Sequence, residues 1–154
     1  MNRRSFLTAC GACAAVLSAP HTVLPSERGI VRNPVAPEGH DPWVIRKDGF
    51  YYYCYSHGGG IRVNRSAALR DAVQFNGREV WKPDPGLAYS REIWAPELHF
   101  LDGGWYIYFA ADDGENEHHR MYVLESDTVD PLGSYSFRGK IADPSDKWAI
   151  DGTV

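Results

Sequence analysis

The sequence predicts an all-β fold of the β-propeller class, with about two blades and the start of a third in this chain. Three observations support this prediction. The stretch from Asp41 to Ser56 aligns without a gap with the stretch from Ala95 to Ala110, at an offset of 95 − 41 = 54 positions. Both stretches contain an Asp-Gly pair followed by aromatic residues, and a third copy begins at Trp148–Asp151. A repeat of roughly 50 residues, made of aromatic strands and turns, is typical of one four-stranded propeller blade.

The two Asp-Gly pairs, Asp48-Gly49 and Asp102-Gly103, each predict a tight hairpin. Asp and Gly accept the positive φ angles of two-residue hairpin turns, so such a pair between apolar runs is a strong local signal. In the first copy, the run Trp43–Ile45 should form the first strand and the run Phe50–Ser56 the second. The same two strands are expected on either side of Asp102-Gly103.

The remaining elements complete each blade. Ile61–Ser66 and Met121–Ser126 correspond at an offset of 121 − 61 = 60 positions and should form the third strands. The other expected elements are a turn or short helix at 67–74, a strand at Val80-Trp81 ended by Lys82–Gly86, an acidic loop at Ala111–His119, a turn at Asp130–Gly133 and an outer strand at Tyr135–Ile141. A closed propeller needs at least about four blades. We therefore expect this chain to be the front part of a longer protein, with a complete β-sandwich as the alternative.

The N-terminal residues 1–20 read as an export signal of the twin-arginine type. Arg3 and Arg4 precede an apolar, small-residue segment from Phe6 to Ala19, which is shorter than the roughly 20 residues of a membrane-spanning helix. We expect export by the twin-arginine machinery, to the periplasm or the outside of the cell, and no membrane span. Cys10 leaves a lipoprotein signal as an alternative. Residues 21–32 read as an extended lead-in, and residues 33–154 as a partial propeller domain.

The charge and the aromatic content of the chain indicate which classes of molecule it binds. The net charge is −4 and 13% of the residues are aromatic, so no basic surface is expected to bind nucleic acid. Sugars suit such a protein, because their C–H faces pack on aromatic rings and their hydroxyls bond to a few polar groups. Of three cysteines, only Cys54 lies outside the predicted signal, and its place in an aromatic strand favours core packing over nucleophilic chemistry.

Candidate chemistry comes from two aspartates in equivalent positions of the repeat. Asp41 and Asp151 precede the innermost strands of the first and third copies, although 151 − 41 = 110 positions separate them. Innermost strands line the axis of a propeller, so both carboxylates should face one channel mouth. Paired carboxylates in such a site can hydrolyse glycosides, one activating water and a protonated one assisting the leaving oxygen. The alternative is that each aspartate only caps backbone groups at a strand start or turn.

Four motifs in order resemble family 43 of the glycoside hydrolases. They are His40–Val44, Gly60–Val63 followed by Ser66, Ile93–Leu98, and Asp146–Val154. The resemblance extends from about Asn33 to the last residue. It implies a five-bladed β-propeller of the family that includes α-L-arabinofuranosidases, arabinanases and β-xylosidases, with the exo-acting arabinofuranosidases most similar.

The resemblance also implies roles for individual residues. Members of the family invert the anomeric configuration, so Asp41 would be the general base and Asp151 the carboxylate that raises the pKa of the general acid. Trp94 would belong to the sugar-facing wall. The acid itself is a glutamate on a later blade, beyond Val154. We expect a polysaccharide or oligosaccharide as substrate, and neither a cofactor nor a metal. A carbohydrate-binding propeller without turnover is the alternative function.

Two further candidates carry less weight. Glu97 is two residues past the aspartate position of the repeat and could face the channel, but the family pattern does not use that position as the acid, so a hydrogen bond within the channel is expected. His118 and His119 are adjacent and lack the spacing of metal ligands. They are expected to lie in a solvated loop.

Overall fold

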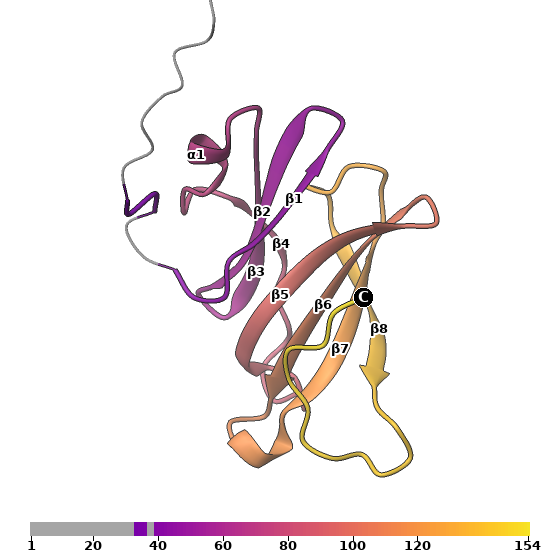
Figure 1. Cartoon of the computed structure of the whole chain (residues 1–154). Helices are drawn as coiled ribbons and strands as arrows, with labels where there is room; N and C mark the ends of the chain where they lie inside the picture. The colour runs from indigo at the N-terminus through magenta and orange to yellow at the C-terminus, as the bar shows by residue number, and fades with distance from the viewer. Residues whose placement is uncertain (1–32, 37–38) are drawn as a thin grey trace, which may run out of the picture. The chain divides into compact units, whose positions relative to one another are not determined.

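The computed structural model describes residues 33–36 and 39–154. The predicted export signal (1–20) and the lead-in (21–32) lie outside the described residues. Within them, two four-stranded sheets are formed, each by strands that follow one another in sequence (Figure 1). This confirms the all-β prediction and the two-blade repeat. No helix of the described part is long and apolar enough to cross a membrane.

The first sheet is antiparallel and has the strand order β1-β2-β3-β4. Its elements are β1 (Trp43–Lys47), β2 (Phe50–His57), β3 (Gly60–Ser66), the short helix α1 (Leu69–Ala72) and β4 (Arg78–Trp81). Lys47 pairs with Phe50 across the first hairpin, which leaves a turn of two residues. Asp48 has φ 50° and Gly49 φ 83°, the positive angles that a twisted two-residue turn requires.

The second sheet repeats this arrangement with the order β5-β6-β7-β8. Its elements are β5 (Arg91–Leu101), β6 (Gly104–Asp112), the 3₁₀ turn η1 (Asn116–His118), β7 (Arg120–Ser126) and β8 (Tyr135–Ile141). The hairpin at Asp102 (φ 48°) and Gly103 (φ 87°) has the same positive angles as the first. The register of β5 against β6 shifts twice between Arg91 and Glu97, so the start of β5 is irregular.

Apolar side chains from both sheets form one core. Alternate residues of β6 contribute buried side chains, as expected for a strand with one face toward the core; these are Trp105, Ile107, Phe109 and Ala111. Residues of the first sheet, including Cys54, Ile61 and Val63, belong to the same cluster. A polar contact also joins the sheets, because the Trp43 indole N–H donates to the carbonyl of Leu98 at 2.8 Å.

Two local predictions are wrong. The strand expected to follow Asp151 as the start of a third blade is absent: residues 142–154 have no strand structure, no described strand pairs with this segment, and a strand requires a ladder partner. Its backbone contact is a bond from Ala149 N–H to the carbonyl of His119 at 3.2 Å. The predicted loop at Ala111–His119 is also shorter, because β6 continues to Asp112, and His119 is fully buried.

Candidate active site

Asp41 and Asp151 line one pocket of about 240 Å³. Its other lining residues are Pro42, Trp43, Ala95 and Glu97. The residues just before and at the start of β1, the middle of β5 and the C-terminal segment each contribute part of the wall. The two aspartates expected to converge therefore do so, although they are far apart in sequence.

The three equivalent positions of the repeat share an unusual backbone conformation. Asp41, Ala95 and Asp151 have φ angles of 45°, 42° and 54°. A left-handed conformation costs a residue with a side chain about 1–2 kcal/mol, and such strain concentrates at functional sites. The three equivalent positions therefore share one backbone conformation, although no strand follows Asp151.

The carboxylates of Asp41 and Asp151 are open to solvent. Both residues are exposed, and no hydrogen bond joins either side chain to another described residue. A capping aspartate would accept a bond from a nearby backbone N–H. Neither aspartate side chain caps a backbone N–H of the described residues.

Glu97 lies on the wall of the same pocket but is already engaged. Its carboxylate is 3.0 Å from His99 Nε2, as the expectation of a hydrogen bond within the channel requires. The His99 ring in turn lies against Trp43, with ring centroids 4.8 Å apart, and edge-on to Tyr108 at 5.6 Å. Burial, and secondarily the charge of Glu97, raise the pKa of the nearby Cys54 thiol.

Trp94 directly precedes the pocket residue Ala95 but is not itself among the lining residues. Its ring stacks on His119 with centroids 3.9 Å apart, and its indole N–H donates to Glu92 at 3.3 Å. Trp43 does line the pocket, although the sequence analysis did not predict it as a site residue. Its position directly after Asp41-Pro42 could have indicated this role.

His119 supports Trp94 from a buried position. Its Nε2 faces the carbonyl of Glu92 at 3.2 Å and its Nδ1 the carbonyl of Asn116 at 3.1 Å. Nδ1 also lies 3.0 Å from a carboxylate oxygen of Asp112, but that oxygen makes no hydrogen bond of good geometry. The other Asp112 oxygen accepts from Gly114 N–H at 2.9 Å. This network fixes the ring against which Trp94 stacks.

Two consecutive four-stranded antiparallel sheets, formed by sequence repeats of roughly 50 residues, are typical of the β-propeller class. Within that class, the chain belongs to the glycosyl hydrolases family 43, whose family model matches residues 31–154. An α-L-arabinofuranosidase from Lactobacillus brevis of known structure is 36% identical, with a TM-score of 0.69 over 79% of this chain and 42% of that one. This confirms the resemblance inferred from the motifs.

Two curated relatives are named extracellular exo-α-(1→5)-L-arabinofuranosidases. The protein from Streptomyces avermitilis is 34% identical over 87% of this chain. The one from Streptomyces chartreusis is 30% identical over 99% of this chain. The chain spans 29% and 48% of their respective lengths.

Proposed function

We propose that this chain supplies the first two blades of an inverting glycoside hydrolase. Its substrate would be an α-L-arabinofuranosyl linkage of arabinan, arabinoxylan or their oligosaccharides. One observation carries the proposal: Asp41 and Asp151 line a single pocket. Membership of family 43 and the arabinofuranosidase names of the relatives support the reaction and the sugar.

In this proposal Asp41 is the general base. Its solvent-open carboxylate can accept a proton from a water molecule that attacks the anomeric carbon. Inversion requires that water to lie between the base and an acid on the opposite side of the sugar, with the two carboxyl groups about 6.5–9.5 Å apart. We assign the acid to a later blade of the protein that contains this chain.

Asp151 is proposed to act on that acid rather than on water. A second carboxylate near the acid disfavours ionisation of the acid, which keeps it protonated and able to assist the departing oxygen. Trp94 is proposed to form part of the sugar-facing wall. Its stacking on His119 and its position next to the pocket residue Ala95 support that role.

The direct test is Asp41→Asn in the protein that contains this chain with its remaining blades. The variant keeps shape and tolerance of positive φ but cannot take the proton. We expect kcat/KM on an aryl α-L-arabinofuranoside to fall about 10²–10⁴-fold. Asp48→Asn is the matched control, because Asp48 also has positive φ (50°) but lies in the hairpin turn.

Near-normal turnover by Asp41→Asn would contradict the base assignment.

Proton NMR of the reaction should show that the first-formed sugar has the anomeric configuration opposite to that of the substrate. Faster cleavage of an aryl β-xyloside than of the arabinofuranoside would show that the preferred substrate is a β-xyloside. Sugar binding with no product from the unmodified protein would favour a carbohydrate-binding propeller.

We also propose export by the twin-arginine route. The pair Arg3-Arg4 and the extracellular names of the relatives support it. Residues 1–32 fused to a folded reporter should carry the reporter out of the bacterial cytoplasm. Replacing both arginines by lysine should stop export, and unaffected export would contradict the proposed route.

A further inference from the structure

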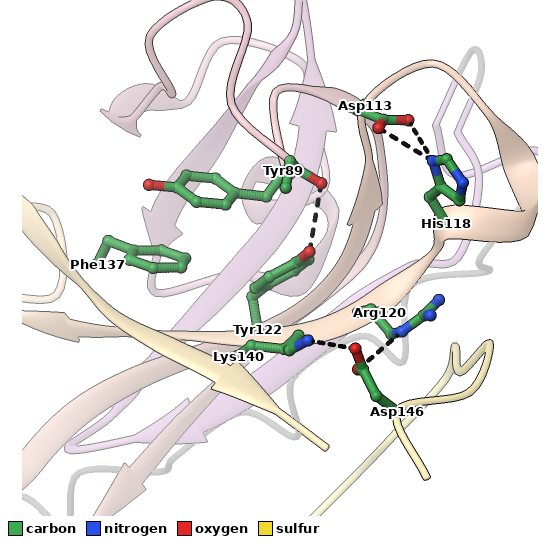
Figure 2. Close-up of a pocket in the computed structure, with 9 residues that line it drawn as sticks. Tyr89, Asp113, His118, Arg120, Tyr122, Phe137, Lys140 and Asp146 are labelled. Carbon is green, nitrogen blue, oxygen red and sulfur yellow. Dashed lines mark hydrogen bonds and ion pairs between the residues drawn. The ribbon is translucent and has the colours of Figure 1, made fainter. Parts of the chain in front are cut away.

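A second pocket lies on the second sheet, apart from the one that contains Asp41 and Asp151. It measures about 390 Å³ and is drawn in Figure 2. It is lined by Ala88, Tyr89, Asp113, His118, Arg120, Tyr122, Phe137, Lys140 and Asp146. The geometry points to a second carbohydrate-binding site, which takes a neutral part of the oligosaccharide chain away from the bond that is cut.

Aromatic rings form one wall of this pocket. Tyr89 stacks on Phe137 with ring centroids 4.0 Å apart and nearly parallel planes, at 12°. Tyr122 packs beside both rings, and its hydroxyl donates to the carbonyl of Ala88 at 3.2 Å. Tyr122 is itself buried, so the half-buried rings of Tyr89 and Phe137 supply the rigid apolar surface, which is of the kind that packs against the C–H groups of a sugar.

Charged side chains form the opposite wall, and they are paired with one another (Figure 2). His118 Nδ1 lies 3.0 Å from the Asp113 carboxylate. Asp146 accepts from Arg120 at 3.0 Å and from Lys140 at 2.7 Å. Such pairs present fixed donors and acceptors side by side, which suits hydroxyl groups because each can donate and accept.

The pairing also selects against a charged ligand. The carboxylates of Asp113 and Asp146 offset the cations of the wall, so little net charge is left for an anion to neutralise. A uronic acid would have to displace Asp146 from Arg120 and Lys140. A neutral sugar can bond to the outer edges of the same groups without breaking the ion pairs.

The location connects this pocket with the proposed active site. Arg91 at the start of β5 pairs with Asp112 at the end of β6, so the loop that carries Asp113 and His118 lies at the end of the sheet where β5 begins, four positions before the active-site pocket residue Ala95. Asp146 precedes Asp151 by five positions, so their Cα atoms are at most about 18 Å apart. A short oligosaccharide can span that distance. The inference rests on the proposed function for its choice of sugar.

Binding should be measured by calorimetry with α-1,5-linked arabinotriose as the probe. The protein is the one that contains this chain, carrying Asp41→Asn so that the probe is not consumed. His118→Ala and Lys140→Ala change exposed side chains of the pocket wall and are each expected to weaken binding about fivefold, the effect of losing one hydrogen bond. Arg138→Ala is the matched control, because Arg138 is also an exposed cation on β8, paired with Glu125 at 2.7 Å, but does not line the pocket.

In the protein with Asp41 intact, both pocket variants should also lower the ratio of kcat/KM on arabinan to kcat/KM on the aryl arabinofuranoside. Unchanged arabinotriose binding in both variants, or tighter binding of a galacturonic acid trisaccharide than of arabinotriose, would overturn the inference. A protein that binds arabinotriose through His118 and Lys140 but never hydrolyses it would contradict the proposed function and leave this site established.

Discussion

At the scale of single residues, the two kinds of polar side chain near the proposed active site differ in what surrounds them. Asp41 and Asp151 are exposed and open to a ligand, whereas Glu97 is held by His99. Cys54 is fully buried. Its setting is that of a core residue, and the pKa of its thiol is raised by burial and then by Glu97.

The Cys54 thiol should therefore be unreactive in the folded protein. A thiolate is the reactive form, and both burial and a raised pKa suppress it. With Cys10 and Cys13 removed by replacement with serine, a thiol reagent at pH 8 should label the protein only after denaturant is added. Labelling of the native protein at the rate of the unfolded chain would contradict this placement.

At the scale of elements, the segment that carries Asp151 is fastened to the second sheet at two points. Asp146 accepts hydrogen bonds from Lys140 and Arg120, and Ala149 N–H donates to the carbonyl of His119 at 3.2 Å. The bond from Lys140, followed by that from Arg120, lowers the pKa of Asp146. Asp146 also has positive φ (45°), which asparagine tolerates.

This ion pair should make the protein less stable in acid. Because the folded pKa of Asp146 lies below its unfolded value of about 3.9, the pair stabilises the fold above that pH and ceases to do so as pH falls through the folded pKa. Asp146→Asn should lower the thermal midpoint at pH 7, and the difference from the unmodified protein should shrink as the pH falls below the unfolded pKa of about 3.9 and vanish below the folded pKa. Asp84→Asn, which changes an exposed aspartate, is the control. A difference that persists in acid would show that charge is not its cause.

At the scale of the whole molecule, local sequence signals predicted the elements well. Both Asp-Gly hairpins are present because the positive φ angles of a two-residue turn are favoured by the residues in the turn itself. The strand Tyr135–Ile141 was predicted with the bounds that the structure has. The convergence of Asp41 and Asp151 followed from the repeat, since equivalent positions in a propeller occupy equivalent places around its axis.

What the sequence did not predict depends on contacts between distant segments. The burial of His119 requires Trp94 and Asp112 around it. The second pocket requires Tyr89, which precedes β5, to meet Phe137 of β8. The strand expected after Asp151 is absent, because no described strand pairs with that segment. None of these features has a signal within a short window of sequence.

The most direct test of the proposed active site is a double-mutant cycle on Asp41 and Asp151. The kcat/KM for an aryl α-L-arabinofuranoside would be measured for the unmodified protein, Asp41→Asn, Asp151→Asn and the double variant. Residues that serve one reaction as a unit lose activity non-additively, so each single variant should be severely impaired and the double variant little worse than the poorer one. Near-normal activity of either single variant, or losses that simply multiply, would contradict the claim that these two carboxylates act together in one pocket.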